Sequence, residues 1–166
     1  ISRFKKFEWI YANVLQQPLS PEQSRALGEQ FSALALEKIL ACPFVPGAEA
    51  ALAALSARLP LFVASGTPQD ELTMIVERRG LAARFREVWG TPREKPAILA
   101  DVMARHGWGR EQVLFIGDGE SDYKAATAAG VHFLARETAA LGTRWRDLDV
   151  PRAPDLTSLV ELVERW

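Results

Sequence analysis

Hydrophobic residues among the first 42 positions recur every three to four residues, the spacing of one face of an α-helix. They are Phe4, Phe7, Ile10, Tyr11, Val14 and Leu15, and then, after a break, Leu27, Phe31, Leu34, Leu36 and Ile39. The break, QQPLSPEQ, carries the signals of a helix start, because Ser20 can cap, Pro21 suits the first turn and Gln23 can complete a capping box. Residues 1–42 are therefore predicted to be helical.

From Pro43 onward, short apolar runs of strand type alternate with helical patterns. The runs PLFVAS, REVWG, QVLFIGD and VHFLAR predict strands, and the segments FVPGAEAALAALSARL, TPQDELTMIVERRG, EKPAILADVMARHG, SDYKAATAAG and DLTSLVELVERW predict helices. This alternation is typical of an α/β fold with a Rossmann-like parallel sheet and helices on both faces. Residues 137–154, with two prolines, are predicted to form a long irregular loop.

Composition narrows the possible partners. The chain has 166 residues, 48% of them hydrophobic, which is enough for a buried core. Its 20 Lys and Arg nearly balance its 21 Asp and Glu, so no global charge favours nucleic acid or an anionic membrane surface. No apolar run reaches the roughly 18 residues of a membrane span. The single cysteine, Cys42, suits a reducing compartment, and we expect a cytoplasmic protein.

Ligands of parallel α/β sheets bind beyond the carboxyl ends of the strands. After the run LFVA come Ser65, Gly66 and Thr67. A hydroxyl and successive backbone N–H groups at the start of a helix can hold an anion such as phosphate. The alternative is a plain helix N-cap by Ser65 or Thr67, with Pro68 in the first turn.

After the run LFIG come Asp118 and Asp122. Two carboxylates at a strand end and a helix start suit Mg²⁺, which binds through one or two carboxylates together with waters and substrate phosphate. The alternative is a turn aspartate at Asp118 and, at Asp122, an acid that complements the helix dipole. The metal hypothesis additionally predicts a phosphate site and a cation nearby.

A cation is available at Lys95, in EKPAIL, where it opens a predicted helix although a positive charge there opposes the helix dipole. The ordinary interpretation of Lys95 alone is a surface lysine. Together with Ser65 and the Asp118/Asp122 pair, it completes a set of polar side chains at strand–helix junctions. Such a lysine could neutralise a phosphoryl group and keep an attacking carboxylate ionised.

With these residues the chain resembles the haloacid dehalogenase-like (HAD) hydrolases, in particular the branch of phosphoglycolate phosphatases and β-phosphoglucomutases. The likeness runs from about Pro43 to the end. LFVASGTP resembles the second motif, whose Ser or Thr binds the phosphoryl oxygen, EKPAIL the third, which supplies the lysine, and IGDGESD the fourth, whose acids hold Mg²⁺. The resemblance implies an α/β core over 43–166 and a helical cap fragment over 1–42.

One motif of the family is missing. Its first motif, DxDxT or DxDxV after the first strand, supplies the nucleophilic aspartate, and neither string occurs here. RDLDV, at residues 146–150, lies in the predicted loop, after the other motifs and without a preceding apolar run. We therefore expect the first core strand and the nucleophile to lie ahead of Ile1, and this chain to be inactive by itself.

The resemblance implies a Mg²⁺-dependent phosphatase of a small phosphorylated metabolite that works through an aspartyl-phosphate. Ser65, Lys95, Asp118 and Asp122 would be the catalytic residues, phosphate would bind at Ser65, Gly66, Thr67 and Lys95, and Mg²⁺ at Asp118 and Asp122. The alternatives are a dehalogenase, which needs no metal, a mutase, and a non-catalytic binding or regulatory domain. A receiver-like domain is disfavoured because its acids come first in the chain and its lysine last. The substrate's identity and the oligomeric state stay open.

Overall fold

The computed structural model describes residues 3–165 and divides into two compact units. One unit comprises Phe62–Pro92 together with the segment up to Pro43, and the other comprises Phe44–Leu61 together with the segment from Arg93 onward. Ile1 and Trp166, the ends of the predicted helical front and of the predicted last helix, lie outside the described residues. No helix within 3–165 is long and apolar enough to cross a membrane.

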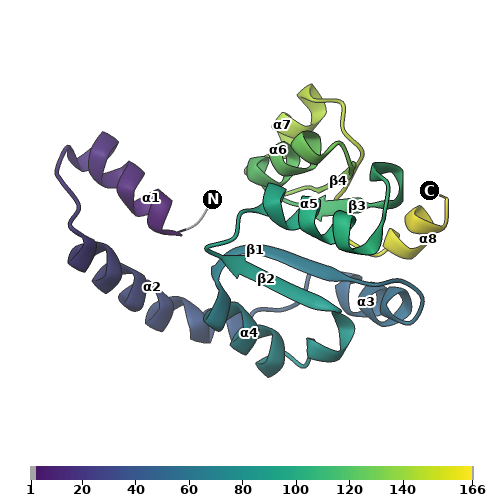
Figure 1. Ribbon diagram of the computed structural model, residues 1–166, viewed down its shortest axis with the longest axis horizontal. Helices are drawn as coiled ribbons and strands as arrows, with labels where there is room; N and C mark the ends of the chain where they lie inside the picture. Colours follow the sequence, from purple (N-terminus) through teal and green to yellow (C-terminus); the bar gives the residue numbers. More distant parts are fainter. Residues whose placement is uncertain (1–2, 166) are drawn as a thin grey trace. The chain divides into compact units, whose positions relative to one another are not determined.

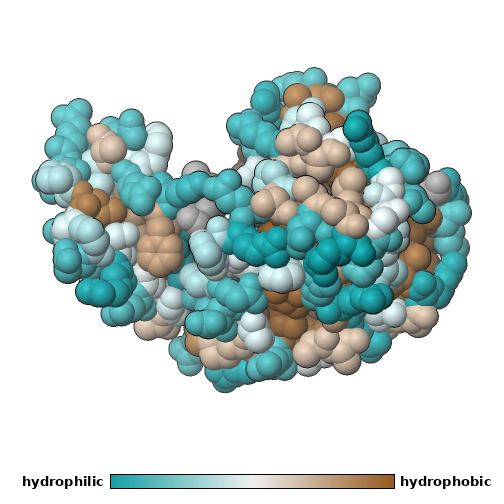
Figure 2. Space-filling model, viewed as in Figure 1, coloured by the Kyte–Doolittle hydropathy of each residue, from teal (hydrophilic) through white to brown (hydrophobic). Residues whose placement is uncertain are grey.

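The helical front of the first unit consists of α1 (Arg3–Ile10), a π-helical turn η1 (Tyr11–Leu15) and α2 (Pro21–Ala41). The predicted capping box is confirmed, because the Gln23 N–H donates to Ser20 Oγ at 3.2 Å and the Ser20 N–H donates to Gln23 Oε1 at 2.9 Å. Three phenylalanines of the predicted stripe form edge-on ring contacts, Phe4–Phe7 and Phe7–Phe31, both at 6.3 Å. The front nevertheless exposes apolar side chains, including Trp9, Val14 and Leu34, and Figure 2 shows hydrophobic atoms on its visible face.

The rest of the first unit is a two-stranded parallel sheet with a helix packed against it. It contains β1 (Phe62–Pro68), α4 (Gln69–Arg78), the 3₁₀ turn η2 (Ala82–Arg84) and β2 (Glu87–Thr91), and Figure 1 shows the two strands side by side. After α4 the chain turns through Gly80 at φ +69°, a left-handed conformation that glycine adopts readily at the end of a helix. Arg79 connects this turn to the end of α2, donating to the carbonyls of Ile39 at 3.0 Å and Cys42 at 2.6 Å.

The second unit contains a three-stranded parallel sheet in the order β3-β4-β5. Its elements are α3 (Ala48–Ser56), α5 (Lys95–His106), η3 (Arg110–Gln112), β3 (Leu114–Gly117), α6 (Glu120–Ala129), β4 (His132–Arg136), α7 (Gly142–Asp147), β5 (Arg152–Ala153) and α8 (Leu159–Glu164), most of them labelled in Figure 1. One face packs through Phe133 and Ala135 against α5, α6 and α7. The other packs through Leu134 and Ala153 against α3 and α8. The predicted α/β fold with parallel sheets and helices on both faces is thus confirmed.

The prediction of an irregular loop over residues 137–154 was wrong. This segment contains α7 and the short strand β5. Trp145 of α7 is fully buried, with its ring 5.8 Å from that of Phe133, and the Glu137 N–H donates to the Ala153 carbonyl at 2.8 Å. The packing of Trp145 and the backbone hydrogen bonds of Ala135 to Pro151 and of Glu137 to Ala153 hold these elements, which are too short to leave a periodic pattern in the sequence.

Among the described strands, β1 and β3 belong to separate sheets and do not pair. The predicted boundary between a cap fragment and a core at residues 42 and 43 stays a prediction, as does the location of a further strand.

Candidate functional site

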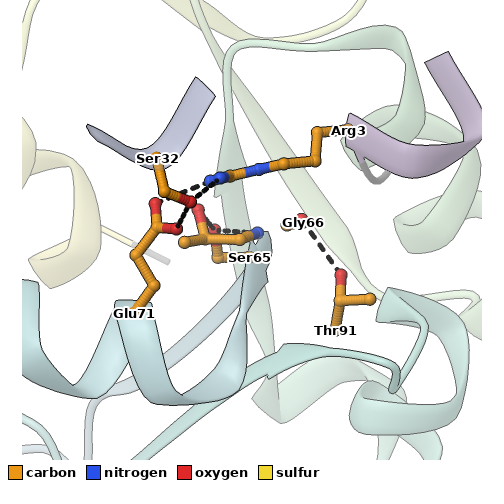
Figure 3. Close-up of polar contacts among 7 residues, drawn as sticks. Arg3, Ser32, Ser65, Gly66, Glu71 and Thr91 are labelled. Carbon is orange, nitrogen blue, oxygen red and sulfur yellow. Dashed lines mark hydrogen bonds and ion pairs between the residues drawn. The ribbon is translucent and has the colours of Figure 1, made fainter. Parts of the chain in front are cut away.

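Ser65, Gly66 and Thr67 lie within β1, where its register with β2 shifts between Ala64 and Pro68, and not at the helix cap considered as the alternative. Ser65 Oγ accepts the Thr67 N–H at 3.1 Å and lies 3.1 Å from Thr67 Oγ1 (Figure 3). β1 continues through Pro68, and α4 begins only at Gln69 without any side-chain cap. The Gly66 carbonyl accepts a hydrogen bond from the Thr91 hydroxyl at 3.0 Å, which connects this part of β1 to the end of β2.

A buried ion pair that the sequence analysis missed lies in the same unit. Arg3 Nη2 of α1 donates to Glu71 Oε1 at 2.6 Å, and the Ser32 hydroxyl of α2 donates to Glu71 Oε2 at 2.7 Å (Figure 3). Both charged side chains are only 9% exposed. The guanidinium also lies over the Phe31 ring, 4.7 Å from its centroid. Three segments distant in the sequence are therefore joined at one carboxylate, Glu71.

Burial raises the pKa of Glu71, but the hydrogen bonds from Arg3 and Ser32 and the charge of Arg3 outweigh it, so the pKa lies below its ordinary value. Nothing in the sequence points to this contact. An acidic residue in the first turn of a helix is common, and Arg3 lies 68 positions away.

In the second unit, Lys95 and Asp122 form an ion pair, as expected if they act together. Lys95 is the first residue of α5, and its Nζ donates to Asp122 Oδ1. The other carboxylate oxygen, Oδ2, accepts the Gly119 N–H at 3.0 Å, which caps α6. Asp122 is therefore both the dipole-complementing acid of the simpler interpretation and the partner of the lysine. Both of its oxygens already accept a donor from the protein.

Asp118 directly follows β3 and is exposed. Within residues 3–165, its carboxylate makes no hydrogen bond or ion pair, and no group of three or more His, Cys, Asp or Glu side chains is placed to hold a metal ion. Mg²⁺ needs no such group, because it retains waters and binds through one or two carboxylates plus phosphate oxygens. The donor set fits this ion best with Asp118 as the direct ligand and Asp122 contributing through water.

The structure brings Lys95 and Asp122 together. Asp118 lies between the end of β3 and the start of α6. Ser65, Gly66 and Thr67 belong to the other unit. Their convergence with the second-unit residues stays a prediction.

A family model described as haloacid dehalogenase-like hydrolase matches residues 10–136. The chain belongs to this family. Among curated relatives of this chain, the phosphoglycolate phosphatase of Synechococcus elongatus is 29% identical over 128 residues, which are 75% of this chain and 60% of the relative. The chain thus spans less than two thirds of that relative's length.

Solved structures of the family share the fold. A predicted phosphoglycolate phosphatase from Haemophilus somnus aligns with a TM-score of 0.69 and 21% identity, over 94% of this chain and 73% of its own. The L-2-haloacid dehalogenase from Xanthobacter autotrophicus aligns with a TM-score of 0.63 and 19% identity, over 98% of this chain and 82% of its own. Because phosphatases and a dehalogenase both match, the fold alone does not choose the reaction.

Proposed function

We propose that the protein carrying this chain is a Mg²⁺-dependent phosphatase of a small phosphorylated metabolite. The observation that carries the proposal is the group at the carboxyl edge of β3, where Asp118 is exposed and Lys95 is paired with Asp122. A dehalogenase needs no divalent cation. The exposed Asp118 carboxylate, which could bind one, together with the Lys95–Asp122 pair therefore favours phosphoryl transfer. The curated relative's name supports the same choice.

The proposed role of each residue follows from the charge and the hydrogen-bonding groups of its side chain or backbone. Lys95 would neutralise the phosphoryl oxygens, and the Ser65 hydroxyl with the N–H groups of Gly66 and Thr67 would bind them. Asp118, with Asp122 through water, would hold Mg²⁺, which supplies Lewis-acid stabilisation of phosphoryl charge when bound. Asp122 would also hold the Lys95 ammonium in place.

The reaction also requires a nucleophile, and none of these residues is proposed for that role. A carboxylate oxygen would attack phosphorus, the P–O ester bond would break, and the leaving oxygen would take a proton from a neighbouring acid. Water would then hydrolyse the acyl phosphate to regenerate the carboxylate and release phosphate. We assign the activity to the whole protein, in which an aspartate outside this chain would be the nucleophile.

The test is hydrolysis of p-nitrophenyl phosphate and 2-phosphoglycolate by the whole protein, with Mg²⁺ and with excess EDTA. We expect phosphate release that EDTA abolishes and added Mg²⁺ restores. A Ser65→Ala variant should lower kcat/KM at least about tenfold, while Ser56→Ala, in α3, should leave it unchanged. Chloride release from a 2-haloacid in the presence of EDTA, without phosphate release, would instead identify a dehalogenase.

A further inference from the structure

Arg136, the last residue of β4, is half-buried, and one nitrogen of its guanidinium has no hydrogen-bond partner among residues 3–165. Its Nε atom is inaccessible to solvent and has no hydrogen-bond partner. Within residues 3–165, its guanidinium also makes no ion pair. Buried polar atoms of native proteins nearly always have a partner, so an unsatisfied arginine nitrogen requires an explanation.

Arg136 lies at the same edge of the sheet as Asp118. Gly117 of β3 pairs with Ala135 of β4, so Asp118, which follows β3, and Arg136, which ends β4, both lie at the carboxyl edge. Strand residues alternate between faces, and Ile116 and Leu134 both pack toward α3 and α8. Arg136 continues this alternation in β4 and belongs to the face of Leu134.

Asp118 and Arg136 carry opposite charges at the same edge of the sheet but form no ion pair with each other. Another acid near Arg136 is Asp155, whose pKa is lowered mainly by the Thr157 hydroxyl and N–H and less by the charge of Arg136. Asp155 Oδ1 already accepts both Thr157 donors, at 2.6 and 2.9 Å, and does not bond Arg136.

We propose that Arg136 binds an anionic oxygen of the substrate and thereby determines specificity. The inference rests on the proposed function, because Asp118 would hold the cation that faces the same ligand. A guanidinium offers paired N–H donors that match a carboxylate or phosphoryl group, and a phosphorylated acid carries both kinds of oxygen. The anionic oxygen of such a ligand would give Arg136 an opposite charge, and the cation that Asp118 would hold would do the same for that carboxylate.

Arg152 provides the matched control. It lies on the neighbouring strand β5, pairs in register with Ala135 on the opposite face, and is already bonded to Glu137 at 3.3 Å. Arg136→Ala, Arg136→Lys and Arg152→Ala would be compared in the whole protein, with unfolding in urea measured for each. An arginine with a merely structural role would change the free energy of unfolding and leave KM unchanged.

For Arg136→Ala we expect KM to rise about tenfold with kcat little changed. Arg136→Lys should raise KM less than Arg136→Ala does, and the KM of Arg152→Ala should equal that of the wild type. A rise confined to 2-phosphoglycolate assigns Arg136 to the carboxylate, and an equal rise with p-nitrophenyl phosphate assigns it to the phosphoryl group. An unchanged KM for both substrates overturns the proposal.

A binding measurement separates this inference from the proposed function. Inorganic phosphate and 2-phosphoglycolate should raise the melting temperature of the wild type and of Arg152→Ala, and clearly less that of Arg136→Ala. If this difference appears without phosphatase activity, Arg136 binds anions and the proposed reaction is wrong. If neither anion stabilises the wild type, or both stabilise Arg136→Ala equally, the role of Arg136 is refuted.

Discussion

Gly117 and Asp122 are packed so closely that no side chain fits at the glycine. A Cβ built on Gly117 would collide with Cβ and Cγ of Asp122 and lie 2.8 Å from its Oδ2. The first helical turn of α6 therefore closes directly over the end of β3. This approach holds the Asp122 carboxylate where Lys95 and the Gly119 N–H both reach it.

Gly117→Ala should therefore destabilise the protein and disturb the carboxylate at the same time. Forcing one methyl group into a packed site typically costs about 1–3 kcal/mol, and here the group that must yield is the side chain of Asp122. Urea unfolding measures the loss. Gly142→Ala, at the start of α7, is the control, because nothing lies within 4 Å of its added Cβ. Equal stability of the two variants would show that Gly117 is not tightly packed.

The segment that the sequence analysis took for a loop should be essential to the core. Trp145 is 0% exposed, and Trp145→Ala should cost about 3–5 kcal/mol, as large aromatic deletions in cores do. Trp9, which is 60% exposed, is the control, and its replacement by Ala should change stability by less than about 0.5 kcal/mol. A flexible loop over residues 137–154 would instead make both substitutions equally mild.

Periodic and local signals were sufficient for most of the fold. Helical spacing and the Ser20 capping box located α2. The three left-handed glycines after α4, α5 and α6 follow helices that were expected to end there. The alternation of strand-like and helical segments along the chain predicted the parallel strands. Each of these features depends on residues close together in the chain. The short α7 and β5 were missed because a long-range contact, Trp145 on Phe133, stabilises them.

The site could be predicted only in part, for the same reason. Lys95 and Asp122 were singled out because each sits at a strand–helix junction, and the structure joins them. The Arg3–Glu71 pair has no local signature, since it depends on how α1 packs against α4. Arg136 was also missed, because its position at the sheet edge and the lack of a hydrogen-bond partner for its Nε can be recognised only in the folded structure.

Breaking the Arg3–Glu71 pair should strongly destabilise the first unit. Removing one partner leaves the other as an uncompensated buried charge, which typically costs about 3 kcal/mol or more. Glu71→Ala should show this loss in urea unfolding, whereas Glu77→Ala, at an exposed position of the same helix, should be nearly neutral. Arg3→Met combined with Glu71→Ala should cost less than the sum of the single changes. Additive effects would contradict a direct ion pair.

The same carboxylate should make stability depend on pH in the acid range. The folded-state pKa of Glu71 lies below its ordinary value of 4.5, so the unfolded chain takes up this proton first on acidification. The contribution of Glu71 is therefore complete above pH 4.5 and is lost progressively as pH falls below it through the folded-state pKa. Glu71→Gln should flatten the fall in unfolding free energy between about pH 5 and 3 relative to Glu77→Gln. An identical slope in both variants would exclude this assignment.

Asp118 should account for stabilisation by Mg²⁺, if the proposed metal role is right. For a dissociation constant on the order of 1 mM, Mg²⁺ at roughly 10 mM would stabilise the folded state by about 1.4 kcal/mol, visible as a higher melting temperature. Asp118→Asn should remove that rise, because it replaces the exposed carboxylate with a weaker neutral ligand. Asp147→Asn, at an exposed position of α7, should keep the wild-type response. Equal stabilisation of both variants by Mg²⁺ would place the cation elsewhere and leave Asp118 as a turn residue.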